Sequence, residues 1–199
     1  MNKNMENIFD NVYKNRIWDI TTNSISGKGS EPINCQNWNS LLNNIIKEKD
    51  IKSILDFGCG DAASIMDLNL DGIIYTGVDI SVIPLNKAKE KYKNNNNINF
   101  IHKTDNKIEN EYDLCIIKHV FGHWMDRKDN GLKGLNCKAS HKITDFLLEN
   151  FDKFKYIIIN DNIDDRISNF LPKNLEYKKI KFNSYGNKYN NLYFYDFNN

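Results

Sequence analysis

The feature of the sequence that most restricts its fold is an alternation of short apolar runs with helical patterns. Five runs are continuously apolar and bounded by polar or glycine-rich segments. They span residues 53–57, 73–79, 98–102, 113–118 and 155–160. Parallel strands have this composition because helices cover both of their faces. The sequence therefore predicts a mostly parallel sheet in an α/β domain.

Helical patterns occupy the segments around these runs. Residues 84–93 begin with a proline suited to a first helical turn and place Leu85, Ala88 and Tyr92 on one face. Residues 37–49 and 139–150 carry similar apolar stripes. Only residues 103–111 separate the third and fourth runs, so a helix there is a single turn or absent.

The chain ends in a different pattern. Residues 175–197 hold two segments rich in Tyr and Phe on either side of residues 184–187, which predicts an antiparallel hairpin. We expect a three-layer sandwich with a seven-stranded, mostly parallel sheet that ends in this hairpin. Residues 1–50 form a helical and loop extension that packs on the core, residues 51–199, within one structural domain.

Composition limits the partners and the compartment. The 199 residues suit a single domain, and a formal net charge of +1 gives no overall attraction to a polyanion. Four cysteines are widely spaced without a C-x-x-C pair, which favours a reducing, cytoplasmic compartment. The N-terminal residues lack the apolar core of a signal peptide, and no run approaches the length of a membrane helix. We expect no membrane partner.

A glycine loop follows the first apolar run, in the sequence ILDFGCGDAAS. Gly58, Gly60 and Ala63 fit the spacing G-x-G-x-x-[GA], and Asp79 ends the next run about 20 residues on. Glycines let the backbone approach a ligand closely, and a carboxylate at a strand end can accept from two ribose hydroxyls. The pattern predicts a nucleoside site.

The charges around the loop restrict which class of nucleoside ligand it can bind. Asp56 and Asp61 flank the glycines. At an effective dielectric constant of about 20, a phosphate 4 Å from one of these carboxylates would be repelled by roughly 4 kcal/mol. A ligand with an ammonium and a sulfonium group and no phosphate would be attracted. S-adenosylmethionine is therefore the expected cofactor.

Four segments together resemble a known family. ILDFGCGDA, YTGVDIS, FIHKTD and DLCIIKHVFGHW are similar, in order and spacing, to the motifs of class I, Rossmann-like S-adenosylmethionine-dependent methyltransferases, over about residues 51–160. The resemblance extends to a small bacterial-type subgroup. This subgroup has a Ser-Gly-x-Gly-Ser loop, here residues 26–30, and a Lys-x-Val-x-x-His-Trp segment, here residues 118–124.

The resemblance implies which residues bind the cofactor. Asp56, Gly58 and Gly60 border its methionine part, and Cys59 and Asp61 of the same loop are further candidates for cofactor contact. Asp79 binds the ribose, Ile80 lies against adenine, and Asp105 accepts from the adenine amino group. The segment after Asp105 is shorter than is usual in the family.

Several of these residues also have purely structural interpretations. Asp79 could cap the following helix, and Asp61 could be the N-cap of a helix after the loop, with or without touching the cofactor. The loop at residues 26–30 could be a flexible connection, or it could fold over the methionine end so that Ser30 or Lys28 meets the carboxylate. Lys118 is a further candidate for cofactor contact.

Catalytic candidates follow the fourth run, at the edge of the sheet where such folds bind ligands. They are Lys118, His119 and His123. His123 is the first choice for a general base because a neutral imidazole accepts a proton near physiological pH. The alternative is a packed histidine beside Trp124. The polar segment 125–136 could close over the acceptor.

No metal is predicted. A magnesium site near Asn160 and Asp161, with Asp164 and Asp165, is conceivable, but a solvated acidic helix start explains these residues more simply. Trp18 and Trp38 are expected in packing roles.

The expected function is methyl transfer to an oxygen or nitrogen of a small acceptor, such as a saccharide or another metabolite. One alternative is RNA or cap methylation, suggested by five lysines near the hairpin: Lys173, Lys178, Lys179, Lys181 and Lys188. A non-catalytic cofactor-binding scaffold is the other. The oligomeric state stays open, although an exposed aromatic hairpin could pair with a second copy.

Overall fold

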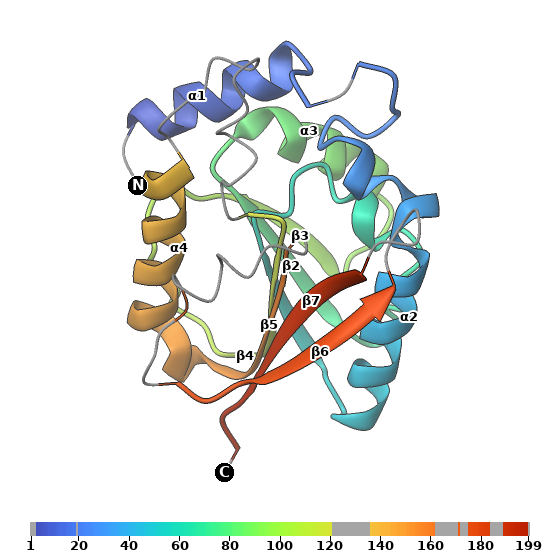
Figure 1. Ribbon diagram of the computed structural model, residues 1–199. Coiled ribbons are helices and arrows are strands. Elements are labelled where there is room, and N and C mark those ends of the chain that lie inside the picture. The colour runs from blue at the N-terminus through green and yellow to red at the C-terminus, as the bar shows by residue number, and fades with distance from the viewer. Residues whose placement is uncertain are drawn as a thin grey trace.

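The computed structural model describes residues 3–18, 20–120, 136–161, 171, 175–183 and 189–198. Its centre is a seven-stranded sheet in the order β3-β2-β1-β4-β5-β7-β6 (Figure 1). The strands are β1 (Ser53–Phe57), β2 (Ile74–Asp79), β3 (Ile98–His102), β4 (Tyr112–Lys118), β5 (Phe154–Asp161), β6 (Lys178–Asn183) and β7 (Tyr189–Asp196). The first five are parallel, and β7 runs antiparallel to both β5 and β6. The predicted fold class is confirmed.

The longer helices are α1 (Lys3–Lys14), α2 (Pro32–Glu48), α3 (Val82–Lys91) and α4 (Asn136–Asn150). Single helical turns occur at η1 (Lys28–Ser30), η2 (Ala63–Ile65) and η4 (Phe151–Lys153). Residues 103–111 contain no helix, as their short length predicted. Pro32 begins α2 five residues before the predicted start, because its fixed φ suits the first helical turn.

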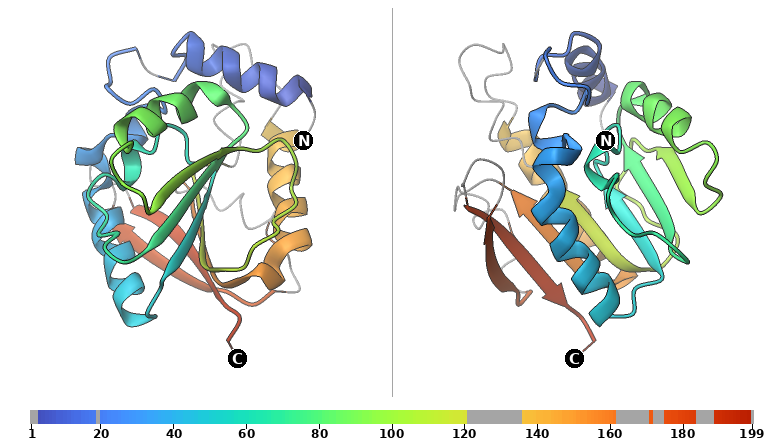
Figure 2. Two further views of the ribbon diagram at one scale, coloured as in Figure 1. Left: turned by 180° about the vertical axis from the view of Figure 1, so that it is seen from behind. Right: turned by 90° about the vertical axis from the view of Figure 1, so that its right-hand side faces the viewer.

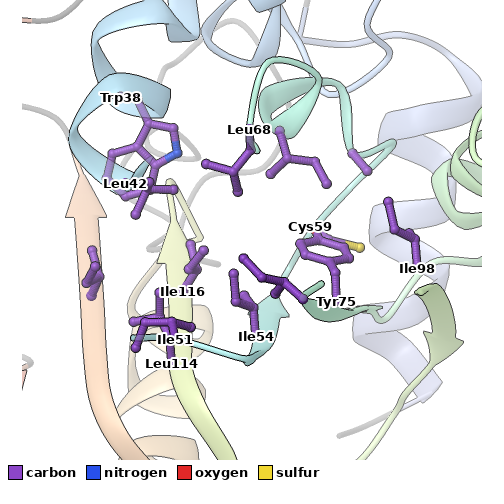
Figure 3. Close-up of a cluster of buried hydrophobic side chains, with 14 of the residues drawn as sticks. Trp38, Leu42, Ile51, Ile54, Cys59, Leu68, Tyr75, Ile98, Leu114 and Ile116 are labelled. Carbon is purple, nitrogen blue, oxygen red and sulfur yellow. The ribbon is translucent and has the colours of Figure 1, made fainter. Parts of the chain in front are cut away.

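The sheet is the middle layer of three. On one face, α2 and α3 pack against alternate side chains of the strands, with Trp38, Leu42 and Leu85 in one buried cluster with Ile54 and Ile116 (Figure 3). Trp38 therefore has the packing role expected of it.

On the other face, α4 supplies three buried side chains, Ile143, Phe146 and Leu147. The Phe146 ring stacks on Phe57 with the ring centroids 3.9 Å apart. Both faces of the central strands are thus covered, which is why those strands are continuously apolar.

The aromatic hairpin is not the exposed surface that the sequence suggested. Leu192, Tyr193 and Tyr195 of β7 are buried, because β7 lies between β5 and β6 rather than at the edge of the sheet. Tyr177, just before β6, is 40% exposed. The pattern of alternating tyrosines therefore reflects core packing of β7.

Helix α1 lies across the end of the sheet beside α3 (Figure 2). Met5 and Val12 are buried there in a small cluster that includes Ile80. Two polar contacts hold the helix in place. Ser81 Oγ donates to Asp10 Oδ1 at 2.5 Å, and His102 Nε2 lies 3.1 Å from Glu6 Oε1. These contacts hold α1 against residues that follow β2 and end β3.

Within the described part of the chain, no helix combines the length and apolar character needed to cross a membrane.

Candidate functional site

A cavity opens at the carboxyl ends of β1, β2 and β4, beneath α1. This is the position where the strand order reverses between β1 and β4, and where open α/β sheets bind ligands. Its walls are largely apolar: Met5, Phe9, Tyr13, Trp18, Phe57, Gly58, Val78, Asp79, Ile80, Lys103, His119, Val120 and Ile143. Its volume is about 90 Å³, whereas ligand pockets usually measure roughly 300–1,000 Å³. Side chains of the wall must therefore move to admit a nucleoside.

The glycines of the loop are required by close packing. Gly58 has φ +78° and Gly60 has φ +58°, a region that favours glycine. A Cβ added at Gly58 would lie 2.6 Å from Val120 Cγ2, and one at Gly60 would collide with Ser26 Oγ. Gly58 lines the cavity, while Gly60 is covered by Ser26.

The backbone N–H groups of residues 58–62 are already used inside the chain. Gly58 and Cys59 donate to the Val78 carbonyl at 2.8 and 3.1 Å, and Ala62 donates to the Cys59 carbonyl at 3.1 Å. Gly60 donates to Asp79 Oδ2 at 2.9 Å, and residue 61 donates to Ser26 Oγ at 3.0 Å. A dinucleotide site needs such groups free to bind its diphosphate. Residues 58–62 as folded leave none of them for that purpose.

Asp79 is the carboxylate that faces the cavity. It is buried, and Oδ1 and Oδ2 accept from Ser81 N and Gly60 N, each at 2.9 Å. Burial raises the pKa of Asp79 to about 6 against these two hydrogen bonds, so it is ionised at neutral pH. The cap of α3 is Ser81, whose Oγ accepts from Ile83 N at 3.3 Å. The capping interpretation of Asp79 is therefore wrong.

Asp56 and Cys59 lie on the other side of the loop. Side chains alternate along β1, so Asp56 points away from the face on which Phe57 lines the cavity. It accepts from Tyr75 Oη at 2.6 Å, and burial raises the pKa of its carboxyl to about 6. Cys59 belongs to the buried cluster under α2 and α3 (Figure 3). The structure thus puts both beside the core, not in the cavity.

Asp61 has a structural role that the sequence did not indicate. Its carboxylate is fully buried; Oδ1 accepts from Ser24 Oγ and Ser26 Oγ at 2.9 Å each, and Oδ2 accepts from Ile25 N at 3.0 Å. It holds residues 24–26 against the glycine loop. The N-cap of η2 is Ala62, with no side-chain cap, so the N-cap interpretation of Asp61 is wrong.

Asp105, which was predicted to bind adenine, is not among the residues that line the cavity. Asp105 is 68% exposed and pairs with Lys103 at 2.7 Å, and this hydrogen bond lowers the pKa of the Asp105 carboxyl. Lys103, which the sequence analysis did not single out, lines the cavity instead, as does the predicted Ile80.

Lys118, the last residue of β4, and His119, the residue after it, have different positions. His119 lines the cavity with φ +55°, and its backbone N–H donates to the Asn160 carbonyl at 2.8 Å. The Lys118 side chain reaches η1 instead, where its Nζ donates to the Gly29 carbonyl at 2.9 Å. A Cβ built on Gly29 would lie 3.4 Å from His119 Nδ1. Lys118 therefore positions the loop that packs on His119.

Ser30, the other residue predicted to reach the cofactor, ends η1 and donates its backbone N–H to the Gly27 carbonyl at 3.0 Å. His123 and Trp124 lie outside the described residues, as do residues 125–135 of the predicted lid.

A group of cavity residues to which sequence reasoning gave no part in the site comes from the N-terminal segment: Met5, Phe9, Tyr13 and the neighbouring Trp18. Residues 5, 9 and 13 are spaced four apart, so they share one face of α1. This spacing was the available signal. Trp18 packs edge-on against Tyr13 with the ring centroids 4.7 Å apart, which agrees with its expected packing role.

Among the described residues no cluster of three or more His, Cys, Asp or Glu side chains could hold a metal ion. Asn160, one of the conceivable magnesium ligands, is buried and donates from Nδ2 to the Asn191 carbonyl at 3.1 Å. Asp164 and Asp165 lie outside the described residues.

Comparison with known proteins supports the predicted family. A family model described as a methyltransferase domain matches residues 55–132, which are 78 of the 199 residues. No curated protein sequence matches the chain significantly.

Solved structures of methyltransferases share the architecture. The N-methyltransferase NodS from Bradyrhizobium japonicum WM9, in complex with S-adenosyl-L-homocysteine, aligns with a TM-score of 0.66 at 12% identity, over 94% of this chain and 98% of that one. Magnesium protoporphyrin IX methyltransferase (ChlM) from Synechocystis PCC 6803, with bound S-adenosylmethionine, aligns with a TM-score of 0.64 at 16% identity. The alignment covers 96% of this chain and 93% of that one. The fold is that of the class I methyltransferases.

A third similar structure is larger than this chain. The bifunctional kinase-methyltransferase WbdD aligns with a TM-score of 0.59 at 16% identity, over 81% of this chain. The chain spans only 39% of the length of WbdD.

Proposed function

We propose that the chain is an S-adenosylmethionine-dependent methyltransferase that acts on an oxygen or nitrogen of a small acceptor. The observation that carries the proposal is Asp79, an ionised carboxylate at the wall of the cavity beside a glycine loop whose N–H groups are all engaged. This arrangement suits a cationic nucleoside and disfavours a diphosphate. The methyltransferase-domain match and the neighbours solved with S-adenosylmethionine or S-adenosylhomocysteine support the same cofactor.

The cavity residues fit this cofactor in defined roles. Asp79 would accept from the ribose hydroxyls, and Ile80 would cover one face of the adenine ring. The carboxylate of Asp79 costs less to bury when a positive charge lies near it, so the cofactor's cation and the protein's anion stabilise each other. When bound, S-adenosylmethionine supplies an electrophilic methyl group. The apolar side chains of α1 exclude water from that group.

Two basic residues line the cavity among those described; Lys103 is paired with Asp105, so His119 is the proposed base. A neutral imidazole there can accept the proton that an acceptor hydroxyl or neutral amine loses as its oxygen or nitrogen bonds to the methyl group. His123 remains the other proposed base, and the segment 118–124 is the feature that would place the chain in the His-Trp subgroup. Proximity also contributes, because aligning two bound reactants can supply several kcal/mol by itself.

The structurally similar methyltransferases differ in the acceptors that they methylate. NodS is an N-methyltransferase, whereas ChlM acts on a porphyrin, so the fold serves different acceptors. A saccharide hydroxyl is our first choice, with a reducing cytoplasm as the setting; Cys35, Cys59 and Cys115 are buried free thiols. The lysines behind the RNA alternative are less well placed. Lys178, Lys179 and Lys181 lie on β6, separated from β4 by β5 and β7.

Transfer of a labelled methyl group tests the proposal. The full chain is incubated with methyl-tritiated S-adenosylmethionine and, separately, with pools of saccharides, small amines and total RNA. We expect label in a small-molecule pool. Label in RNA alone, with RNA binding that weakens steeply with salt, would establish the alternative. Cofactor binding without transfer to any pool would favour a scaffold.

Variants of the two histidines separate chemistry from structure. His119→Ala or His123→Ala should lower turnover far more than cofactor affinity if that histidine is the base. Equal losses in turnover and affinity would mean that the histidine is structural.

A further inference from the structure

Helix α1 forms one wall of the cavity without belonging to the sheet (Figure 2). In the wall formed by the sheet, Phe57 and Val78 lie at the ends of β1 and β2, and each of these strands is paired with a strand on both sides. The buried side chains of α1, Met5 and Val12, form a small cluster apart from the two large clusters on the faces of the sheet. Moving α1 would therefore disturb much less of the core than moving the sheet.

In its present position α1 keeps the cavity small. Met5, Phe9 and Tyr13 share one face of the helix and line the cavity, and Met5 and Tyr13 are only 9% and 5% exposed. The volume of about 90 Å³ is below the roughly 300 Å³ at which ligand pockets begin. A nucleoside that enters past this face needs α1 to move away from the sheet.

A hydrogen bond joins α1 to the turn that follows β2. Ser81 Oγ donates to Asp10 Oδ1 at 2.5 Å. The same hydroxyl accepts from Ile83 N at 3.3 Å as the cap of α3, and the Ser81 N–H donates to Asp79 Oδ1 at 2.9 Å. Removing the Asp10 side chain therefore releases α1 and leaves the cap of α3 and the bond to Asp79 in place.

A second contact joins α1 to the end of β3. His102 Nε2 lies 2.8 Å from the Ile80 carbonyl oxygen and 3.1 Å from Glu6 Oε1. A carbonyl oxygen can only accept, so Nε2 carries a proton that the Glu6 carboxylate can share. Neither Glu6 nor Asp10 lines the cavity. Both contacts can therefore form again over a ligand, once the side chains that face the cavity have turned.

The C-terminal end of α1 is fixed by close packing. The helix ends at Lys14, and the chain turns at Arg16, which has φ +50°. Trp18 follows, and a Cβ added at Gly27 would lie 3.1 Å from Trp18 Cβ, so these two residues are in tight contact. The helix can therefore pivot about residues 15–17 while Trp18 stays in place.

We propose that α1 is a lid that opens to exchange the cofactor. Its latch consists of the two contacts described above, Asp10 with Ser81 and Glu6 with His102. The identity of the ligand rests on the proposed function, whereas the opening is a property of the protein without ligand. Both contacts end at residues 79–81 or at the histidine bonded to them, so the lid is tied to the segment proposed to bind the nucleoside.

Thiol labelling of the protein without ligand tests the opening. Val78 is 3% exposed and lines the cavity from β2, so Val78→Cys places a thiol where a reagent reaches it only after α1 moves. Two changes are compared on this background. Glu6→Ala with Asp10→Ala removes the latch and keeps good helix formers in α1, whereas Glu90→Ala removes an exposed ion pair with Lys93 on the surface.

Removing the latch should raise the rate of labelling at position 78 about tenfold, the usual effect of losing one or two hydrogen bonds. Glu90→Ala should not change this rate, and the chain without Val78→Cys gives the background from the native cysteines. Equal rates with and without the latch would overturn the proposal. Labelling of the latched protein as fast as that of an exposed thiol would also overturn it, because the cavity would then already be open.

Exchange of bound ligand tests the role of the lid. Replacement of bound tritiated S-adenosylhomocysteine by an excess of the unlabelled compound gives the dissociation rate constant, and calorimetry gives the dissociation constant. If the ligand enters and leaves through the open form, removing the latch raises the association and dissociation rate constants by the same factor. We expect dissociation to become about tenfold faster, with the dissociation constant within about threefold of that of wild type.

The outcomes separate the lid from the proposed function. An unchanged dissociation rate constant would overturn the lid, while binding of S-adenosylhomocysteine would still support the function. A dissociation constant that rises as much as the dissociation rate constant would also overturn the lid, because α1 would then be only a wall that stabilises the bound state. If wild type does not bind S-adenosylhomocysteine, the proposed function fails, and labelling at position 78 still decides whether α1 opens.

Discussion

Replacing Asp79 with asparagine should remove both the charge and the pH dependence of cofactor binding. The variant keeps the size of the side chain but can no longer offer two carboxylate oxygens to ribose hydroxyls. Hydrogen bonds to a charged acceptor contribute about 1.5–3 kcal/mol each, so the dissociation constant for S-adenosylhomocysteine should rise at least tenfold at pH 7.5.

The pH dependence follows from the pKa of about 6 that burial gives Asp79. The cofactor prefers the carboxylate, so binding lowers this pKa and releases a proton wherever the free protein holds one. Between pH 7 and pH 5 the free protein changes from mostly ionised to mostly protonated. The wild-type dissociation constant should therefore rise about tenfold over this range, while that of Asp79→Asn should not change.

Asp56→Asn is a matched control, because Asp56 is also buried and its pKa is also raised to about 6, but it bonds to Tyr75 rather than facing the cavity. Calorimetric titrations at five pH values between 5 and 7.5 measure all three proteins. The reasoning would be refuted if Asp79→Asn kept the wild-type affinity, or if Asp56→Asn rather than Asp79→Asn lost the pH dependence.

Three further predictions concern stability, each measured by urea unfolding. Asp61→Asn should lower the free energy of unfolding by about 3 kcal/mol or more, since three hydrogen bonds converge on this buried carboxylate. Asp67→Asn, at an exposed residue, should lower it by less than about 0.5 kcal/mol. Equal effects would show that Asp61 does not hold residues 24–26 against the glycine loop. Gly58→Ala and Gly72→Ala share the strain of a positive φ, about 1–2 kcal/mol. A Cβ at position 58 also meets the Val120 side chain, whereas one at position 72 meets nothing. Gly58→Ala should therefore lower the free energy of unfolding by about 1–3 kcal/mol more than Gly72→Ala does. Equal losses for the two variants would contradict this packing. The raised pKa of Asp56 means that its neutral form is favoured in the folded state, so its contribution to stability grows as the pH falls from 7 to 5. Between pH 7 and pH 5 the free energy of unfolding of Asp56→Asn should rise by about 1 kcal/mol less than that of wild type. An equal rise in the two proteins would show that another group is responsible for it.

The sheet could be predicted from sequence because its signal is local. Each of the five parallel strands begins and ends within one residue of the predicted run, since burial on both faces demands continuous apolar sequence. The glycine loop was equally predictable, and Asp79, Ile80 and Gly58 do line the cavity.

The rest of the site depends on contacts between segments far apart in the chain. Nothing local to Asp61 shows that its partners are residues 24–26, which come 35–37 residues earlier. The helical spacing of residues 5, 9 and 13 was present, but only the tertiary structure shows that this face of α1 covers the cavity rather than the sheet. Asp105 was assigned by motif order, yet its neighbour Lys103 is the one whose side chain lines the cavity.

The engaged N–H groups of this glycine loop predict that it accepts a cationic or neutral nucleoside and rejects a diphosphate. Calorimetry of the full chain with S-adenosylhomocysteine and, in parallel, with NAD measures this directly. We predict one molecule of S-adenosylhomocysteine bound per chain and no detectable heat from NAD. Binding of NAD without binding of S-adenosylhomocysteine would contradict the account.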